Sequence, residues 1–151
     1  MKQVRLANEN DIDFIMEAFT SCDYERVLTD DSAPNILYAM NSGQLTGFVL
    51  TNNGRAEACI FYSNDDDVAY LDGLYRKPDA EGSGRSDLKL LFRYAVSILK
   101  GIGFTTIKGT ISSANPNINK LIKVYNTLLG AVVVSVEVRA DVDTALARLE
   151  A

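Results

Sequence analysis

The chain of 151 residues contains no histidine, no tryptophan, only two cysteines and only three prolines. Histidine is the base of Ser-His-Asp triads and a common zinc ligand, so its absence removes a His-based triad and leaves a zinc site without its usual ligands. The cysteines of metal sites usually come in closely spaced pairs, whereas Cys22 and Cys59 are far apart in the sequence. We therefore expect no metal, and two buried, reduced thiols in a cytoplasmic protein.

Long apolar segments are also missing. Residues 1–14 lack the apolar run of a signal peptide, and no segment approaches the roughly 20 apolar residues that span a bilayer. We expect no contact with a membrane. Hydrophobic residues nevertheless make up 47% of the chain, which is enough for a substantial core. No repeat, low-complexity tract or linker divides residues 1–151, so a single domain is predicted.

The formal net charge of −5 is unevenly distributed, because residues 1–75 carry −9 and residues 76–123 carry +6. These charges could simply be the solvated faces of helices. Alternatively, the basic segment surrounds a polyphosphate ligand while the acidic first half attracts a cationic partner. In that interpretation the basic side chains are Arg76, Lys77, Arg85, Lys89 and Lys120. A nucleic acid ligand is not expected, because it requires a basic excess over the whole domain.

Hydrophobic periodicity and turn residues predict alternating strands and helices, which is typical of an α/β layer structure. The expected strands are 4–6, 45–51, 56–62, 68–75, 105–111 and 131–139. The first expected helix is capped by Asn8 or Asn10 and extends to Phe19. The other expected helices cover residues 32–40, about 86–101, 118–128 and 141–150. Asn53-Gly54 suits the turn of a hairpin, and Gly130 is expected to end the fourth helix.

The central stretch of the chain runs from a strand through Gly82 and Gly84 into a helix. The first turn of a helix leaves backbone N–H groups unpaired at the positive end of the helix dipole, so such an entrance can hold a phosphate. Glycines allow a ligand to approach the backbone closely. A plain tight turn is the alternative interpretation of the same pattern.

Around this turn the sequence reads LYxxPDxxGxG, beginning at Leu74. This resembles the acyl-CoA loop of the GNAT superfamily of N-acetyltransferases, whose motif is R/Q-x-x-G-x-G/A. In one register Glu81 occupies the R/Q position and Gly84 the central glycine; in a second, shifted by two residues, the glycines are Gly82 and Gly84. The resemblance covers roughly residues 3–139 and implies a mixed, mostly antiparallel sheet flanked by helices. It also implies acetyl-CoA or another acyl-CoA as cosubstrate and an amine acceptor, either a small molecule or a protein amino group.

A second segment, residues 115–131, is similar to the family's N-x-x-A-x-x-L-Y-x-K-x-G-F/A stretch. The resemblance implies that Asn117 contacts the pantetheine part of CoA and that Tyr125 is the acid for the leaving thiolate. Tyr125 stands one residue from the family position, which Asn126 occupies. A tyrosine of the core is therefore an equal alternative.

The reaction that the resemblance implies also needs a base, which in a chain without histidine we expect to be a carboxylate beside the glycine loop, and groups that bind the oxyanion and the diphosphate. Asp72 is our first candidate for the base that deprotonates the amine, and Glu57 is the second. Strand alternation predicts Tyr70, Asp72 and Leu74 on one face and Leu71, Gly73 and Tyr75 on the other. Backbone N–H groups near Leu74, Tyr75 and Arg76 are expected to bind the oxyanion. The diphosphate is expected on the amides of Gly82, Ser83, Gly84, Arg85, Ser86 and Asp87.

Two alternatives to an enzyme stay open at this point. One is a GNAT-like domain that binds CoA or a protein partner without catalysis. The other is an assembly protein that forms a homodimer through the strand at residues 132–138, which is apolar on both faces and is expected to be buried.

Overall fold

The computed structural model describes residues 1–20, 33–109, 116–134 and 140–150. Its central element is a sheet in which β1 (Lys2–Leu6), β2 (Leu45–Asn52), β3 (Arg55–Asp65), β4 (Val68–Arg76) and β5 (Thr106–Gly109) lie in chain order. Neighbouring strands are antiparallel except for β4 and β5, which are parallel. This confirms the predicted mixed, mostly antiparallel sheet.

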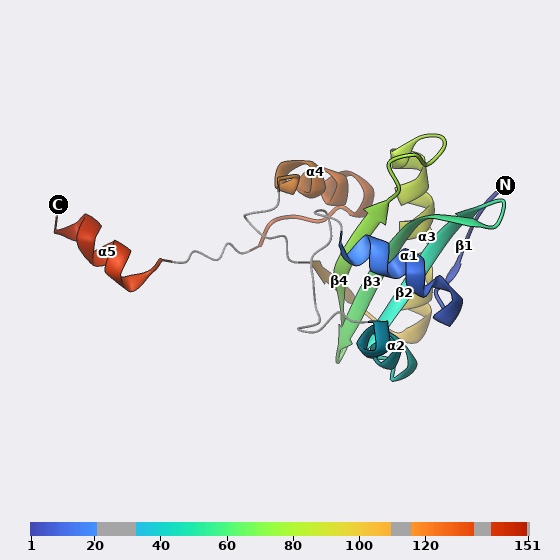
Figure 1. The fold of residues 1–151 in the computed structure, drawn as a ribbon, viewed down its shortest axis with the longest axis horizontal. Coiled ribbons are helices and arrows are strands. Elements are labelled where there is room, and N and C mark those ends of the chain that lie inside the picture. The colour runs from blue at the N-terminus through green and yellow to red at the C-terminus, as the bar shows by residue number, and fades with distance from the viewer. Residues whose placement is uncertain (21–32, 110–115, 135–139, 151) are drawn as a thin grey trace.

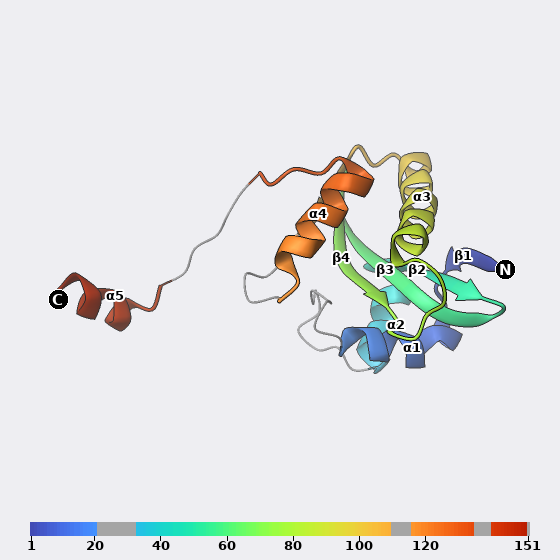
Figure 2. The ribbon, with the colours of Figure 1, turned by 90° about the horizontal axis from the view of Figure 1, so that it is seen from above.

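Helices cover both faces of the sheet (Figures 1 and 2). On one side lie α1 (Ile12–Phe19) and α2 (Ala33–Asn41), and on the other lie α3 (Gly84–Ile102) and α4 (Ile118–Leu129). A short 3₁₀ turn (Glu9–Asp11), capped by Asn8 as predicted, precedes α1. The core is correspondingly split into two clusters. The α3 side buries Phe48, Leu50, Ile60, Leu71, Leu74, Leu91, Phe92 and Leu99 among others, and the α1 side buries Phe14, Ile15, Phe19, Ile36, Val49, Cys59 and Phe61.

The β2–β3 hairpin has the turn that its sequence predicts. Asn53 and Gly54 both have positive φ, 51° and 85°, as a type I′ turn requires. The longest helix, α3, differs from its prediction at both ends. It begins at Gly84, after the N-cap Ser83, and ends at Gly103 in the left-handed conformation (φ 108°), so Gly101 lies inside it. A helix of this amphipathic character tolerates one interior glycine at a modest cost in propensity.

Two β-bulges change the predicted pattern of strand faces. Tyr62 pairs with Leu71 and Phe61 with Gly73, which makes Asp72 an extra residue in β4. Because a bulge shifts the alternation by one residue, Leu71 and Leu74 lie on the same face, in the α3-side core. The predicted separation of Leu71 from Leu74 is therefore wrong. Glu57 is the extra residue of the second bulge, in β3.

The predicted strand at 131–139 is not present in its described part. Residues 131–134 form no strand, and Val132, Val133 and Val134 are 72%, 61% and 83% exposed, so the expected burial is wrong there. Residues 135–139 lie outside the described residues, as do 110 and 111 of the strand predicted at 105–111. The last helix, α5 (Val142–Leu149), is confirmed, but it buries none of its residues and lies apart from the sheet (Figure 1).

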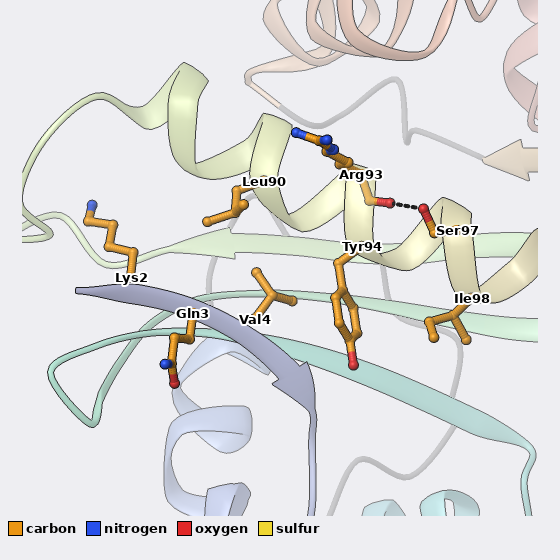
Figure 3. Close-up of a pocket in the computed structure, with 8 residues that line it drawn as sticks. All are labelled: Lys2, Gln3, Val4, Leu90, Arg93, Tyr94, Ser97 and Ile98. Atoms are coloured by element: carbon orange, nitrogen blue, oxygen red, sulfur yellow. Dashed lines mark hydrogen bonds between the residues drawn. The ribbon is translucent and has the colours of Figure 1, made fainter.

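β1 forms one edge of the sheet, and α3 lies beside it. A groove of about 350 Å³ runs between them, with Val4, Leu90, Tyr94 and Ile98 along it and Lys2 at one end (Figure 3). Within the described ranges, no helix combines the length and apolar character needed to cross a bilayer. The same residues contain no cluster of three or more His, Cys, Asp or Glu side chains that could hold a metal ion.

Candidate functional site

The β4–α3 loop (residues 77–83) joins the end of β4 to the N-terminus of α3. It starts with the N–H of Lys77 donating to the Glu57 carbonyl (2.8 Å) and a turn in which the N–H of Ala80 donates to the Lys77 carbonyl (3.1 Å). Gly82 then adopts φ 79°, a conformation that L side chains disfavour, and Ser83 caps the helix. The glycine at 82 is therefore required by the backbone conformation of the loop.

Two cations hold the carbonyl groups of this loop. The Arg76 Nη2 donates to the carbonyls of Ala80 (3.3 Å), Glu81 (3.0 Å) and Gly82 (2.9 Å), while its Nε donates to Asp87 Oδ2 (2.9 Å). Lys2 Nζ donates to the Glu81 carbonyl and to both oxygens of Asp87, at 2.8 and 3.0 Å. The Asp87 side chain is only 3% exposed and connects the two cations.

This arrangement orients the amides of the loop. In a trans peptide the C=O and the following N–H point in opposite directions. Because the Glu81 and Gly82 carbonyls point toward Arg76, the N–H groups of Gly82 and Ser83 point away from it. The N–H groups of Gly84 and Arg85 follow in the first turn of α3, where the helix itself offers no acceptor. Successive amides at the positive end of a helix form a site for an anion.

The amides that were predicted to bind phosphate fall into two groups, those that already have a hydrogen-bond partner and those that do not have one among the described residues. The N–H of Asp87 donates to the Ser83 carbonyl (3.1 Å), and the N–H of Ser86 donates to Ser83 Oγ (3.4 Å). Asp87 is thus engaged through both its backbone N–H and its carboxylate. The four amides of residues 82–85 are the ones that the geometry leaves for a ligand.

The acidic residues of the loop point toward other partners. Asp79 accepts from Arg55 Nη2 (2.7 Å), and this hydrogen bond lowers the pKa of Asp79. Glu81 Oε2 accepts from Asn52 Nδ2 (3.3 Å) at the β2–β3 hairpin. No carboxylate of the described residues accepts a hydrogen bond from the amides of residues 82–85, so no acid of the described parts of the chain fills the entrance of α3.

The five basic residues named for a polyphosphate ligand lie in different surroundings. Arg76 binds the loop carbonyls, and Lys77 Nζ pairs with Glu17 (3.2 Å) and lies 5.6 Å from the centre of the Phe14 ring, on the α1 side. Arg85 and Lys89 are exposed on α3, and Lys120 is exposed on α4. Two of the five predicted cations thus belong to the scaffold.

Glu57, the second candidate base, lies beneath the loop. Its side chain is almost fully buried, and its Oε2 accepts the N–H of Glu81 (3.3 Å). Oε1 is the buried side-chain oxygen that has no hydrogen-bond partner among the described residues. A carboxylate that accepts a loop amide supports the loop, and the role of Glu57 as a base stays a prediction.

Asp72, the first candidate base, lies where the hydrogen-bonded pairing of β4 with both of its neighbouring strands changes. It is the bulge residue, and the pairing of β4 with β5 in the described residues ends one position earlier, at Leu71 opposite Gly109. The backbone of residues 73–76 therefore has no β5 partner within the described parts of the chain. A strand edge that is open just before the loop can donate N–H groups to a ligand.

Leu74 and Tyr75 lie in the part of β4 that has no partner in the described part of β5. Leu74 is buried in the α3-side core, while Tyr75 faces α1, with its ring 5.8 Å from that of Phe14. Burial and the nearby Glu17 carboxylate raise the pKa of Tyr75. Their side chains serve the two cores, which leaves their backbone groups for the predicted role.

Asn117 and Tyr125 belong to α4. Asn117 is the N-cap residue of this helix, and Tyr125 is half-buried with its ring at 6.1 Å from Phe92, edge to face. The helix ends at Gly130 as predicted, with the N–H of Gly130 donating to the Asn126 carbonyl (2.9 Å). Tyr125 therefore contributes to the core, and its role as an acid stays a prediction.

Sequence reasoning missed Lys2. It lies 85 residues from Asp87 along the chain, and no local pattern connects the two. Only the position of β1 at the sheet edge brings the Lys2 side chain to the start of α3 (Figure 3).

Searches for a matching family model and for a matching curated protein both found nothing. Solved structures, in contrast, match over most of the chain, and they show that this protein has the fold of the GNAT acetyltransferases. An aminoglycoside acetyltransferase from an uncultured soil sample, solved with sisomicin, is 13% identical with a TM-score of 0.69; the match covers 93% of this chain and 96% of that one.

Two further matches have similar scores. A ribosomal-protein-alanine N-acetyltransferase from Brucella melitensis is 11% identical with a TM-score of 0.67, covering 93% of this chain and 100% of that one. The PaiA N-acetyltransferase from Thermoplasma acidophilum, solved with coenzyme A, is 14% identical with a TM-score of 0.63, covering 80% and 86%. At these identities the similarity concerns the fold.

Proposed function

We propose that this protein transfers an acyl group from acetyl-CoA, or a related acyl-CoA, to an amine. The observation that carries the proposal is the row of amides at residues 82–85: those of Gly82 and Ser83 point away from Arg76, and those of Gly84 and Arg85 lie in the first turn of α3. A diphosphate needs such donors because its oxygens accept hydrogen bonds and its charge favours the positive end of a helix. Coenzyme A complexes among proteins of this fold support the same ligand.

We propose that the rest of the substrate follows the edge of β4 at residues 73–76, which has no β5 partner among the described residues. We place the thioester beside residues 73–76, where backbone N–H groups can bind the oxygen that becomes negative during the reaction. Each such donor contributes about 3 kcal/mol to the stability of the transition state. Asn117, at the start of α4, is the proposed contact of the pantetheine.

The reaction is a direct transfer. The amine nitrogen attacks the thioester carbonyl carbon, a C–N bond forms, and the C–S bond breaks to release the thiolate. An amine is protonated near neutral pH, so its proton must first pass to a base, for which we propose Asp72, directly or through water. Tyr125 is the proposed donor of the proton that the thiolate takes up.

The acceptor is proposed to be a cationic amine, because the first half of the chain is strongly acidic. Proteins of this fold include one solved with the aminoglycoside sisomicin and one named for the alanine of a ribosomal protein. The acceptor is therefore either a small polycationic amine or a protein amino group, and the assay should include both.

Calorimetry and a thiol-release assay test the proposal together. We expect CoA to bind the purified protein, and acetyl-CoA to release thiol when a panel of polyamines, aminoglycosides and peptide amino termini is added. Binding of CoA without turnover of any amine would indicate a domain that binds but does not catalyse. Absence of CoA binding would refute the proposal.

A further inference from the structure

We propose that Asp87 is a positioning residue that, through Lys2 and Arg76, sets the direction of the phosphate-binding amides. This inference rests on the proposed function. Asp87 has no open path to a ligand, since its carboxylate is buried and both of its oxygens accept hydrogen bonds from the two cations. Its effect on CoA must therefore pass through the groups that it holds.

The two cations need Asp87 in order to stay together. Lys2 comes from β1 and Arg76 from the end of β4, and both bind the carbonyl of Glu81. Two positive charges that share one carbonyl repel each other, and repulsion is strong where little water screens it. The carboxylate between them removes this repulsion. Without its charge, one of the two cations would have to move away from the loop.

The position of the cations decides what the loop presents to a ligand. While Arg76 holds the carbonyls of Glu81 and Gly82, the amides that follow them point outward. If a carbonyl turned outward instead, it would place a partial negative charge against the diphosphate. The three side chains also carry a net charge of +1 behind these amides, which adds to the attraction for an anion.

The close contact between the loop and Lys2 is an independent sign of this arrangement. A Cβ atom at Gly82 would lie 3.3 Å from Lys2 Nζ, closer than most such contacts. The loop is therefore packed directly on the amino group of Lys2. A residue at the start of the N-terminal strand thus becomes part of the phosphate-binding site.

The test compares CoA binding by Asp87→Asn, Asp87→Glu and Lys2→Met. Asn keeps the size of the side chain but removes its charge, and Met keeps the stem of Lys2 in the groove beside α3. We expect Asp87→Asn and Lys2→Met each to raise the Kd for CoA about 10- to 100-fold, the factor that corresponds to losing one charge-assisted hydrogen bond. Asp87→Glu should recover part of the affinity because it restores the charge.

Two controls make the same changes of charge elsewhere. Asp143→Asn lies on exposed α5, and Lys100→Met lies on the exposed C-terminal turn of α3. We expect both to bind CoA within about 3-fold of the wild type, which is the size of an exposed, screened charge effect. Circular dichroism at the temperature of the calorimetry should show that every variant is folded.

Kinetics separate positioning from a general loss of structure. We expect Asp87→Asn to raise KM for acetyl-CoA by the same factor as the Kd for CoA, about 10- to 100-fold, and to leave kcat within about 3-fold of the wild type. The inference is overturned if the wild type binds CoA while folded Asp87→Asn binds it equally well, or if Asp87→Glu loses as much affinity as Asp87→Asn. A wild type that does not bind CoA overturns the proposed function as well, so the two failures are distinguishable.

Discussion

Replacing Gly82 by alanine should weaken CoA binding by distorting the β4–α3 loop. Gly82 has φ 79°, and an L residue in the left-handed region costs roughly 1–2 kcal/mol. The new Cβ would also lie 3.3 Å from Lys2 Nζ, so the amino group must shift by a few tenths of an ångström or the loop must rotate. Either movement changes the hydrogen bonds that orient the loop amides.

Gly43→Ala is a matched control. Gly43 has nearly the same φ, 77°, and a Cβ there would meet no atom within 4 Å. It precedes β2, whose first residues pair with the end of β3 that lies away from the β4–α3 loop. Both variants should lower Tm by about 2–8 °C, because the conformational cost is the same in each.

Only Gly82→Ala should affect the ligand. We expect its Kd for CoA to rise about 10-fold or more, as for the loss of one hydrogen bond to a charged group, while Gly43→Ala keeps the affinity of the wild type. Thermal unfolding followed by circular dichroism and calorimetric titration with CoA measure the two quantities separately. Equal CoA affinity of Gly82→Ala and the wild type would refute the assignment of the loop, and so would an equal loss of affinity in both variants.

Four further outcomes are expected. Gly47→Ala should lower the free energy of unfolding by about 1–3 kcal/mol in a urea titration, because the new Cβ would lie within 2.8 Å of a ring carbon of the buried Phe61. A change below about 0.5 kcal/mol would show that the core has room for this methyl group. Burial alone would raise the pKa of Asp11, but hydrogen bonds from Arg5 and from the Asn8 amide lower it more, so the net pKa lies below its ordinary value. A carboxyl with a lowered folded pKa stabilises the protein above its unfolded pKa of about 3.9 and loses this effect as the pH falls through the folded pKa. Urea titrations should thus show Asp11→Asn less stable than the wild type by up to about 1 kcal/mol at pH 6, with the two converging as the pH falls through the folded pKa of Asp11; a constant difference would exclude this titration. Tyr125→Phe should lower kcat about 100-fold or more if the hydroxyl protonates the thiolate, whereas unchanged kcat would exclude this residue as the acid. Light scattering should show a dimer that dissociates when the chain is shortened directly after α4, because this removes the exposed valines after α4 and the apolar side of α5, which are uncovered in a single chain; a strict monomer at high concentration would exclude this.

Much of the fold follows from patterns only a few residues long. Asn53-Gly54 predicts its turn because both residues tolerate positive φ, and Ser83 caps α3 because a serine oxygen reaches an amide three residues further on. The helix faces follow from a 3.6-residue period that the apolar side chains of α3 obey. The order of strand, glycine loop and helix likewise lies within about thirty residues.

The sequence alone determined where most of the strands and helices form, the strand predicted at 131–139 excepted, and that a glycine loop enters a helix, since those features depend on neighbouring residues. Only the tertiary structure decided which faces the strands present and what holds the loop. Alternation placed Leu71 and Leu74 on opposite faces, but the bulge at Asp72 depends on the register with β3 and puts them together. Lys2 meets Asp87 because the sheet order sets β1 at an edge beside α3, and contacts between such distant residues arise only once the chain has folded.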